Sequence, residues 1–341
     1  MRVVFMGTGE IGVPAFRWLL DSPGCEVVAA VTQPDKPAGR KLALRASAIK
    51  QLAVERGVPV LQPVKMRAAE AVAEIVALRA DVIVVMAYGQ ILPKAVLDAG
   101  RLACLNLHAS LLPRWRGAAP IQAAIEAGDA ASGVTVMYMA EGLDTGDILL
   151  TRATPITDAD TGGSLHDRLA EVAAAALAEV LPLVAAGNAP RTPQDEVGAT
   201  YAAKLSRENG AIDWAATPAE IDRRIRAMNP WPAAHTFLPT PAGPRQLKIF
   251  SCLPRYDVAG PGGVVLEHLP EDLADTGRDA PAPCKESGRP GPGNMRHGIL
   301  VGTGHGAVLL SDVQMEGKKR MSAEEFLRGH PVAPGTLLGG R

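Results

Sequence analysis

The chain has 341 residues, 47% of them hydrophobic, and its 35 basic residues nearly balance its 36 acidic ones. The length predicts two globular domains, and the balanced charge by itself gives no sign of a nucleic-acid partner. No apolar run reaches the ~18 residues of a membrane span. Because the sequence starts directly with a strand-like run, we expect no secretory leader.

The four cysteines, Cys25, Cys104, Cys252 and Cys284, are scattered along the chain and show no paired spacing. The absence of paired spacing argues against a disulfide framework and against a cysteine metal site. We therefore expect reduced thiols in a cytoplasmic protein that needs no metal.

Apolar strands alternate with helices over the first half of the chain. We expect strands at 2–6, 26–31, 58–61, 81–87, 104–108 and 133–139, and helices at 14–21, 46–56, 68–79, 93–99, 120–127 and 164–186. This alternation is typical of a Rossmann-like doubly wound, mainly parallel sheet.

The first strand is followed by Gly7-Thr8-Gly9-Glu10-Ile11-Gly12, a G-x-G-x-x-G pattern. The pattern suggests a dinucleotide site, but such a site also needs an acid at the end of the second strand. That strand ends at Val31, and the next acid, Asp35, lies beyond a proline. We therefore interpret the glycines as a tight structural turn and expect no NAD.

Residues 33–41 form a loop by composition, with two prolines and three cations, Lys36, Arg40 and Lys41. A solvated surface loop is one interpretation. Another is an arm that meets a phosphate backbone, because the three cations can point outward together. A second cationic cluster, Lys318-Lys319-Arg320, carries the same two interpretations.

The second half has a different pattern. Residues 188–207 are rich in Pro, Gly and polar side chains and are expected to link a domain at 1–187 to another at 208–341. Short β-rich runs at 245–250, 263–267, 298–301 and 306–310 predict a small antiparallel barrel, after a helix near 218–228. Residues 269–297 lack periodicity, and we expect a mobile insertion there.

Two polar residues, Asn106 and His108, interrupt the apolar strand at 104–108. They are two positions apart, so they share one face of the strand. Asp144 lies in a glycine-bracketed turn after the strand at 133–139. Ligands of open α/β sheets bind beyond strand ends, and we expect these three side chains to meet at one edge of the sheet. A buried, mutually satisfied Asn–His pair is the alternative.

An amide, an imidazole and a carboxylate without a nucleophilic Ser or Cys suit direct acyl transfer between two bound substrates. The Asn N–H and the imidazole can stabilise a tetrahedral oxyanion, and an imidazole can also pass a proton at neutral pH. Asp144 would orient His108 or hold a relaying water. Ser110 lacks a nucleophile elbow, and one His with one Asp is too few ligands for a catalytic zinc.

Four separated motifs resemble the signature of the 10-formyltetrahydrofolate-dependent formyltransferases. They agree in order and spacing: Asn106-Leu107-His108, Ser110–Pro113, Arg116–Pro120 and Gly142–Asp147. Further segments are similar to the members of that family that act on initiator tRNA: 32–40, 88–93, Asn229–Pro232 and Gly317–Lys319. The resemblance covers nearly the whole chain and weakens across 269–297.

The resemblance implies an N-terminal Rossmann-like domain, a C-terminal OB-like β-barrel and a monomer. It implies formyl transfer from 10-formyltetrahydrofolate to the methionine α-amine of an initiator methionyl-tRNA, for translation initiation, with no membrane and no obligate protein partner. It makes Asn106, His108 and Asp144 catalytic. The implied folate site comprises Ser110, Leu111, Leu112 and Pro113, with the pterin near Gln90, Ile91, Leu92 and the 142–144 turn. The implied tRNA contacts are Lys36, Arg40, Lys41, Lys318 and Lys319.

Three other functions stay open on sequence alone. A formyltransferase could act on a small amine, such as glycinamide ribonucleotide or an amino-sugar nucleotide. A nicotinamide-dependent dehydrogenase is disfavoured by the missing acid after Val31. A tRNA-binding module with an inactive catalytic domain is disfavoured by the intact set Asn106, His108 and Asp144.

Overall fold

The computed structural model describes residues 1–38, 43–269 and 297–339. The chain divides into two compact units. The first holds residues 1–120, 131–155 and 166–203, and the second holds 121–130, 156–165 and the residues from 204 onward. Among the described residues, no helix combines the length and apolarity that crossing a bilayer requires.

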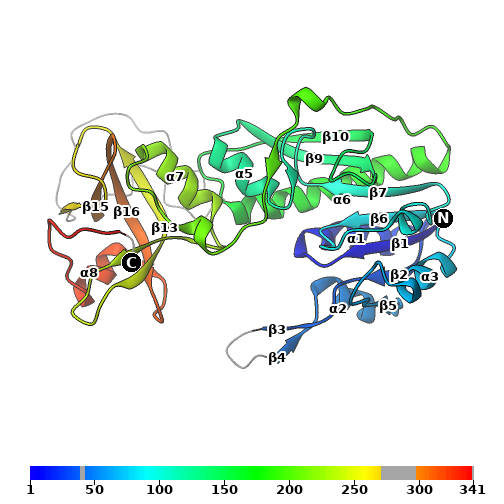
Figure 1. Cartoon of the computed structure of the whole chain (residues 1–341), viewed down its shortest axis with the longest axis horizontal. Coiled ribbons are helices and arrows are strands. Elements are labelled where there is room, and N and C mark those ends of the chain that lie inside the picture. Colours follow the sequence, from blue (N-terminus) through cyan, green and yellow to red (C-terminus); the bar gives the residue numbers. More distant parts are fainter. Residues whose placement is uncertain (39–42, 270–296, 340–341) are drawn as a thin grey trace. The chain divides into compact units, whose positions relative to one another are not determined.

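The first unit is built on a seven-stranded sheet in the order β10-β9-β7-β6-β1-β2-β5 (Figure 1). Its parallel strands are β1 (Arg2–Gly7), β2 (Glu26–Val31), β5 (Val60–Leu61), β6 (Val82–Met86) and β7 (Ala103–His108). Strand β9 (Ala131–Tyr138) runs antiparallel to β7, and β10 (Ile148–Pro155) runs antiparallel to β9. The expected fold class, a doubly wound and mainly parallel sheet, is confirmed.

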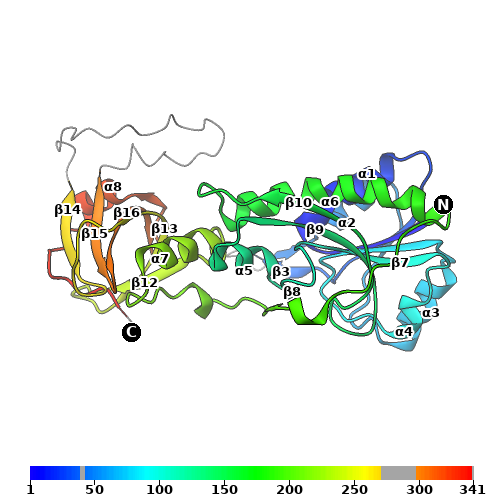
Figure 2. The ribbon, with the colours of Figure 1, turned by 90° about the horizontal axis from the view of Figure 1, so that it is seen from above.

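Helices cover both faces of this sheet. Figure 2 shows α1 (Val13–Asp21) and α6 (Gly162–Ala185) on one face, and α3 (Ala69–Ala77) and α4 (Lys94–Leu97) on the other. Every residue of β6 is buried, as an apolar strand covered on both faces requires. The core beneath α3 and α4 includes Val4, Met6, Ile83, Val85, Ile75 and Val96. This unit also contains 3-10 turns at Glu10–Gly12 and Glu196–Gly198, α2 (Ala48–Glu55), and β8 (Arg116–Gly117) paired with β11 (Tyr201–Ala202).

Two segments of the first unit differ from expectation. Residues 33–41 were expected to form a loop, but β3 (Lys36–Ala38) pairs with β4 (Ala43–Arg45) as a hairpin. Pro37 does not prevent this, because a two-stranded ribbon leaves one edge of each strand unpaired. Strand β10 was not predicted. Its sequence, ILLTRATP, lacks the alternation that marks a strand, since it lies at the edge of the sheet with three consecutive exposed residues.

The second unit is an antiparallel β domain, as expected. Its main sheet runs β12-β13-β16-β15-β14. Residues 336–339 hydrogen-bond to both edges of that sheet, to Phe237 in β12 and to Gly263 and Val265 at β14, and this closes the sheet toward a barrel. Its elements are α5 (Pro120–Ala127), a 3-10 turn (Glu208–Gly210), α7 (Pro218–Ala227), β12 (Ala234–Leu238), β13 (Arg245–Arg255), β14 (Val265–Leu269), β15 (Gly298–Thr303), β16 (Gly306–Met315), β17 (Met321–Ser322) and α8 (Ala323–Gly329).

Candidate active site at the end of strand β7

Strand β7 carries Asn106 and His108 on one face, as the two-residue spacing predicts. Both side chains contact the same carboxylate: Asn106 Nδ2 donates to Asp144 Oδ1 at 3.3 Å, and His108 Nδ1 lies 3.7 Å from that oxygen. The site is screened from solvent, because the side chains of His108 and Asp144 are only 7% and 12% exposed. The three candidate residues therefore form one cluster.

Asp144 reaches this cluster by a route that the sequence did not indicate. Because β9 is antiparallel to β7, its end lies beside the start of β7, where the Met139 amide donates to the Cys104 carbonyl at 2.8 Å. The loop 139–147 then folds back and brings Asp144 over Asn106. A local sequence pattern predicts a strand but not its direction, so the expectation of three strand ends at one edge was wrong in this detail.

The tautomer of His108 is fixed by its neighbour. Its Nε2 lies 2.9 Å from the Trp115 carbonyl oxygen, and a carbonyl only accepts, so Nε2 carries the proton and donates. Trp115 itself has a left-handed φ of 62°, a conformation that surrounding contacts must hold. In the neutral ring Nδ1 then keeps a free lone pair beside Asp144, where it can take up a proton.

Hydrogen bonds within the turn after β7, and from Thr135 on β9, fix its shape. The buried Ser110 hydroxyl donates to the Arg114 carbonyl at 2.7 Å. Thr135 Oγ1 donates to the Ser110 carbonyl at 2.7 Å and accepts from the Leu112 amide at 3.1 Å. Ser110 is therefore committed to shaping the turn, which agrees with its lacking a nucleophile elbow. Leu112 is buried, while Leu111 and Pro113 are half-buried.

The β7 cysteine does not supply a nucleophile. Burial raises the pKa of the Cys104 thiol to about 12, so it stays protonated at neutral pH, and the thiolate is the reactive form. Within the described ranges, no group of three or more His, Cys, Asp or Glu side chains is arranged to hold a metal ion.

Sequence reasoning missed Gln194, which lies in the segment expected to be a linker. Its Nε2 donates to the carbonyls of Asp144 and Gly146, each at 2.8 Å. Its Oε1 accepts from the guanidinium of Arg116. A glutamine in a Pro/Gly-rich polar stretch carries no periodic signal, so only the three-dimensional contact identifies it.

The charge partner of Arg116 is Glu196. The Arg116 side chain is fully buried, and its Nη2 lies 2.8 Å from Glu196 Oε1. This pairing raises the pKa of the Arg116 guanidinium and lowers the pKa of the Glu196 carboxyl. Arg116 was part of a recognised motif, but the motif did not reveal these partners.

The loop after β6 contains the three residues expected near the pterin. Gln90 uses its side chain to bind the neighbouring loop: its Oε1 accepts from the Met66 amide at 2.8 Å, and its Nε2 donates to the Pro63 carbonyl at 3.0 Å. Ile91 is 89% exposed, whereas Leu92 is buried in the core. Of the three, Ile91 is the side chain left free to contact a ligand.

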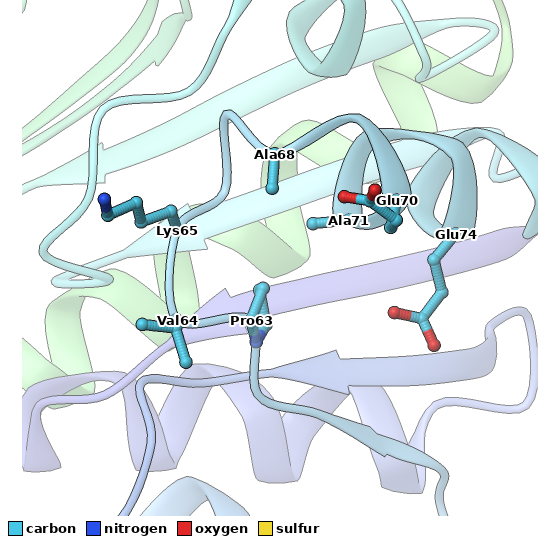
Figure 3. Close-up of a pocket in the computed structure, with 7 residues that line it drawn as sticks. All are labelled: Pro63, Val64, Lys65, Ala68, Glu70, Ala71 and Glu74. Atoms are coloured by element: carbon cyan, nitrogen blue, oxygen red, sulfur yellow. The ribbon is translucent and has the colours of Figure 1, made fainter.

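A shallow groove of about 670 Å³ lies beside that loop, and Figure 3 shows its lining. Lys65 extends to one side, away from Glu70 and Glu74 on helix α3. Neither Asn106, His108 nor Asp144 lines this groove, so it is distinct from the cluster on β7. Its lining residues are Pro63, Val64, Lys65, Ala68, Glu70, Ala71 and Glu74.

Two backbone amides of the glycine turn after β1 already have a hydrogen-bond partner. The amides of Thr8 and Gly9 both donate to the Ala87 carbonyl, at 3.2 and 3.3 Å. A dinucleotide site needs such amides free for the pyrophosphate. Asp35, the first acid after β2, is paired with Lys50 at 2.7 Å. These contacts support a structural role for the turn.

The expected tRNA contacts are only partly described. Lys36, Lys318 and Lys319 are exposed, and Lys36 Nζ donates to Gln33 Oε1 at 3.0 Å. Arg320 is instead ion-paired with Asp312. Arg40 and Lys41 lie outside the described residues, as does nearly all of the expected insertion at 269–297.

Comparisons with known proteins match the chain along its length. A family model described as "Formyl transferase" matches residues 1–181, and one described as "Formyl transferase, C-terminal domain" matches residues 204–331. The chain is 46% identical to a methionyl-tRNA formyltransferase of Pseudomonas fluorescens, over 99% of this chain and 98% of that one. It is 43% identical to one of Geotalea uraniireducens, over 99% and 98%.

Solved structures share the fold at low identity. HypX from Aquifex aeolicus, crystallised with tetrahydrofolic acid, gives a TM-score of 0.58 at 18% identity, over 100% of this chain and 51% of that one. An N-formyltransferase from Helicobacter canadensis, in complex with folinic acid and dTDP-3-aminofucose, gives 0.58 at 15% identity, over 90% and 98%. Identities this low show similarity of fold alone.

Proposed function

The chain belongs to the formyl transferase family, and we propose for it the activity of its full-length relatives, the formylation of methionyl-tRNA. The observation that carries this proposal is the match to those relatives at 46% identity across both domains. The acceptor is the free α-amine of methionine on the initiator tRNA, and the product serves translation initiation.

The donor that fits this chemistry is 10-formyltetrahydrofolate. The amine must be neutral to attack, and an α-amino pKa of about 8 makes that form accessible at neutral pH. The amine nitrogen bonds to the formyl carbon, the carbon–N10 bond breaks, and one proton moves from the amine to N10. No proton is gained or lost overall, so one group that takes and returns a proton is enough.

His108 and Asn106 suit the two tasks of this reaction. Because Nε2 of His108 is held on the Trp115 carbonyl, Nδ1 is the nitrogen that takes the proton from the amine and returns it to N10. Asn106 donates one amide hydrogen to Asp144 at 3.3 Å, and its other hydrogen stabilises the tetrahedral oxyanion. Asp144 orients Asn106, and its carboxylate lies 3.7 Å from the His108 Nδ1 that carries the proton during the transfer.

The folate site is proposed on the loops around this cluster. Ser110 and Leu112 are buried, as is Leu92, so these residues shape the wall from behind. Direct contact falls to Leu111 and Pro113, which are half-buried, and to the exposed Ile91. Gln90 contributes by fixing the position of the Ile91 loop.

The cationic residues support a tRNA partner in spite of the balanced net charge, because phosphate contacts need only local positive surface. The hairpin that carries Lys36, with Arg40 and Lys41, would approach the acceptor stem, and Lys318 and Lys319 would contact the tRNA elsewhere. For Arg40→Ala we expect a raised KM for tRNA with folate affinity unchanged, measured by steady-state kinetics with each substrate varied. Unchanged tRNA kinetics would remove this hairpin from the partner surface.

A formylation assay tests the function. Purified chain, 10-formyltetrahydrofolate and charged initiator tRNA should yield formylmethionyl-tRNA, and charged elongator methionyl-tRNA should be a poor acceptor. An amino-sugar nucleotide serves as the small-amine control. Formylation of the sugar without formylation of the tRNA would contradict the proposal and favour the small-amine alternative.

A further inference from the structure

Residues 191–194 lie along the loop that carries Asp144. The Thr192 amide donates to the Ile148 carbonyl at 3.0 Å, and the Thr192 carbonyl accepts from the Ile148 amide at 2.8 Å. The Arg191 guanidinium lies 3.5 Å from the centroid of the Tyr138 ring. Gln194 then reaches the middle of the loop, at Asp144 and Gly146. This segment is therefore fastened to both ends and the centre of the loop 139–147.

Gln194 has its side-chain amide fixed in one orientation. Both Nε2 hydrogens are donated to carbonyls, those of Asp144 and Gly146, and Oε1 accepts from Arg116 Nε and Nη2 at 3.1 and 2.9 Å. A flipped amide would set NH2 against the guanidinium and oxygen against two carbonyls, leaving four groups unsatisfied. The orientation is thus determined by chemistry as well as by position.

Arg116 and Gly117 hold Asp144 from two sides. Arg116 donates to Gln194 Oε1, and Gln194 Nε2 in turn donates to the Asp144 carbonyl. The Gly117 amide donates to Asp144 Oδ2 at 2.8 Å. The buried guanidinium of Arg116 is kept in place by Glu196 on its far side. Backbone and carboxylate of Asp144 are therefore fixed by adjacent residues of one short strand, β8.

Asp144 needs such support, because its φ is 53°. A left-handed conformation is unfavourable for a non-glycine residue and persists only where its surroundings enforce it. If the loop relaxed, Asp144 Oδ1 would move away from Asn106 and His108.

We propose that Gln194, clamped by Arg116, is a positioning residue for Asp144 that holds its peptide in the left-handed conformation which the catalytic cluster requires. The proposal rests on the catalytic role proposed above for Asp144. It gives residues 191–194, which belong to the first unit, a part in the active site.

Gln194→Glu is the sharpest variant, since it keeps the shape and removes both donors from Asp144 and Gly146. We expect kcat to fall tenfold to a hundredfold, as misplacing a catalytic group does, with KM for both substrates within about twofold. Gln194→Met, which is also close in size but uncharged, should give the same pattern. Asn188→Asp is the matched control. It adds one negative charge at an exposed position shortly before Gln194 in the sequence and should leave kcat unchanged.

Single-turnover rates, with melting temperatures for each variant, separate positioning from general stability. In an Asp144→Asn background, Gln194→Glu should cause little further loss, because the group that it positions is already altered. The same tenfold loss in both backgrounds would overturn the proposal, as would unchanged kcat in folded Gln194→Glu and Gln194→Met. An inactive wild-type chain would instead contradict the proposed function itself.

Discussion

Two strand-to-loop junctions of the first unit invite comparison, the glycine turn after β1 and the polar turn after β7. At the glycine turn, the Thr8 and Gly9 amides both donate to the Ala87 carbonyl. After β7, His108 keeps Nδ1 facing a carboxylate, and in the described part of the chain Asn106 donates only one of its two amide hydrogens. The first junction has satisfied its polar groups, whereas the second keeps polar groups available for a substrate.

The difference teaches that a motif is informative only when its functional atoms are free. The glycines resemble a dinucleotide fingerprint in spacing, yet two amides of their turn already donate to the Ala87 carbonyl. Asn106 and His108 match no short general motif, but the fold sets them against Asp144, and the side chains of His108 and Asp144 are only 7% and 12% exposed. Variants at each junction can break or sharpen this contrast.

The largest effect is expected at Asn106. Asn106→Ala removes an oxyanion donor, and we expect turnover to fall by about a hundredfold or more, with little change in substrate KM. Asn106→Asp should be at least as severe, because it sets a second carboxylate against Asp144 Oδ1, where the amide now lies at 3.3 Å. Steady-state kinetics with both substrates varied measures this. Near wild-type turnover in both variants would remove Asn106 from the chemistry.

A smaller effect is expected at Gly117. Its φ is 107°, and an added Cβ would lie 2.5 Å from the Ala202 carbonyl oxygen. Gly117→Ala must therefore shift β8, including the amide that donates to Asp144 Oδ2. We expect a melting temperature lower by several degrees and kcat lower by about tenfold. Thermal unfolding and kinetics below the transition separate the two effects; an unchanged melting temperature would show that β8 accommodates the Cβ.

The smallest effect is expected at Tyr88, between the two junctions. Its buried hydroxyl has no hydrogen-bond partner among the residues that the structure describes, so Tyr88→Phe should leave the free energy of unfolding equal or raise it by up to ~1 kcal/mol. Unfolding by denaturant at neutral pH measures this change.

Alkaline pH offers a second measurement on the same residue. Burial raises the pKa of Tyr88 to about 12, above the value near 10 of an unfolded chain. The stability that Tyr88 contributes through this shift is complete below about pH 10 and is lost as pH rises through 12. Tyr88→Phe should therefore weaken the alkaline loss of stability. An unchanged alkaline profile would show that the hydroxyl is not buried in solution.

Much of the fold could be predicted from the sequence, because apolar runs and helical periodicity are local patterns. Strand β6 was predicted from its apolar run, and α6 was predicted from its periodicity. Strand β10 was missed because an edge strand with exposed residues has no clear alternation. The pairing of β3 with β4 was missed because Pro37 and the charged residues around it resemble a loop in composition.

The candidate site was predictable in its residues but not in its construction. Asn106, His108 and Asp144 are recognisable from strand position and from resemblance. The antiparallel direction of β9, which makes the loop 139–147 fold back, is a property of the whole sheet and has no local signature. Gln194 lies fifty residues from Asp144 in sequence, and only the folded chain places its amide on that residue's carbonyl.

The central claim is that formyl transfer takes place at the β7 junction and not at the glycine turn. Single-turnover formylation at saturating substrate, comparing His108→Ala with Gly9→Ala, tests it most directly. Gly9 has an ordinary φ of −70°, and an added Cβ would approach Ala87 Cβ to 3.1 Å, so only a slight adjustment is needed. We predict a loss of about a hundredfold or more for His108→Ala and a rate within about twofold of wild type for Gly9→Ala. A His108→Ala rate close to wild type, or a larger loss in Gly9→Ala, would contradict the account.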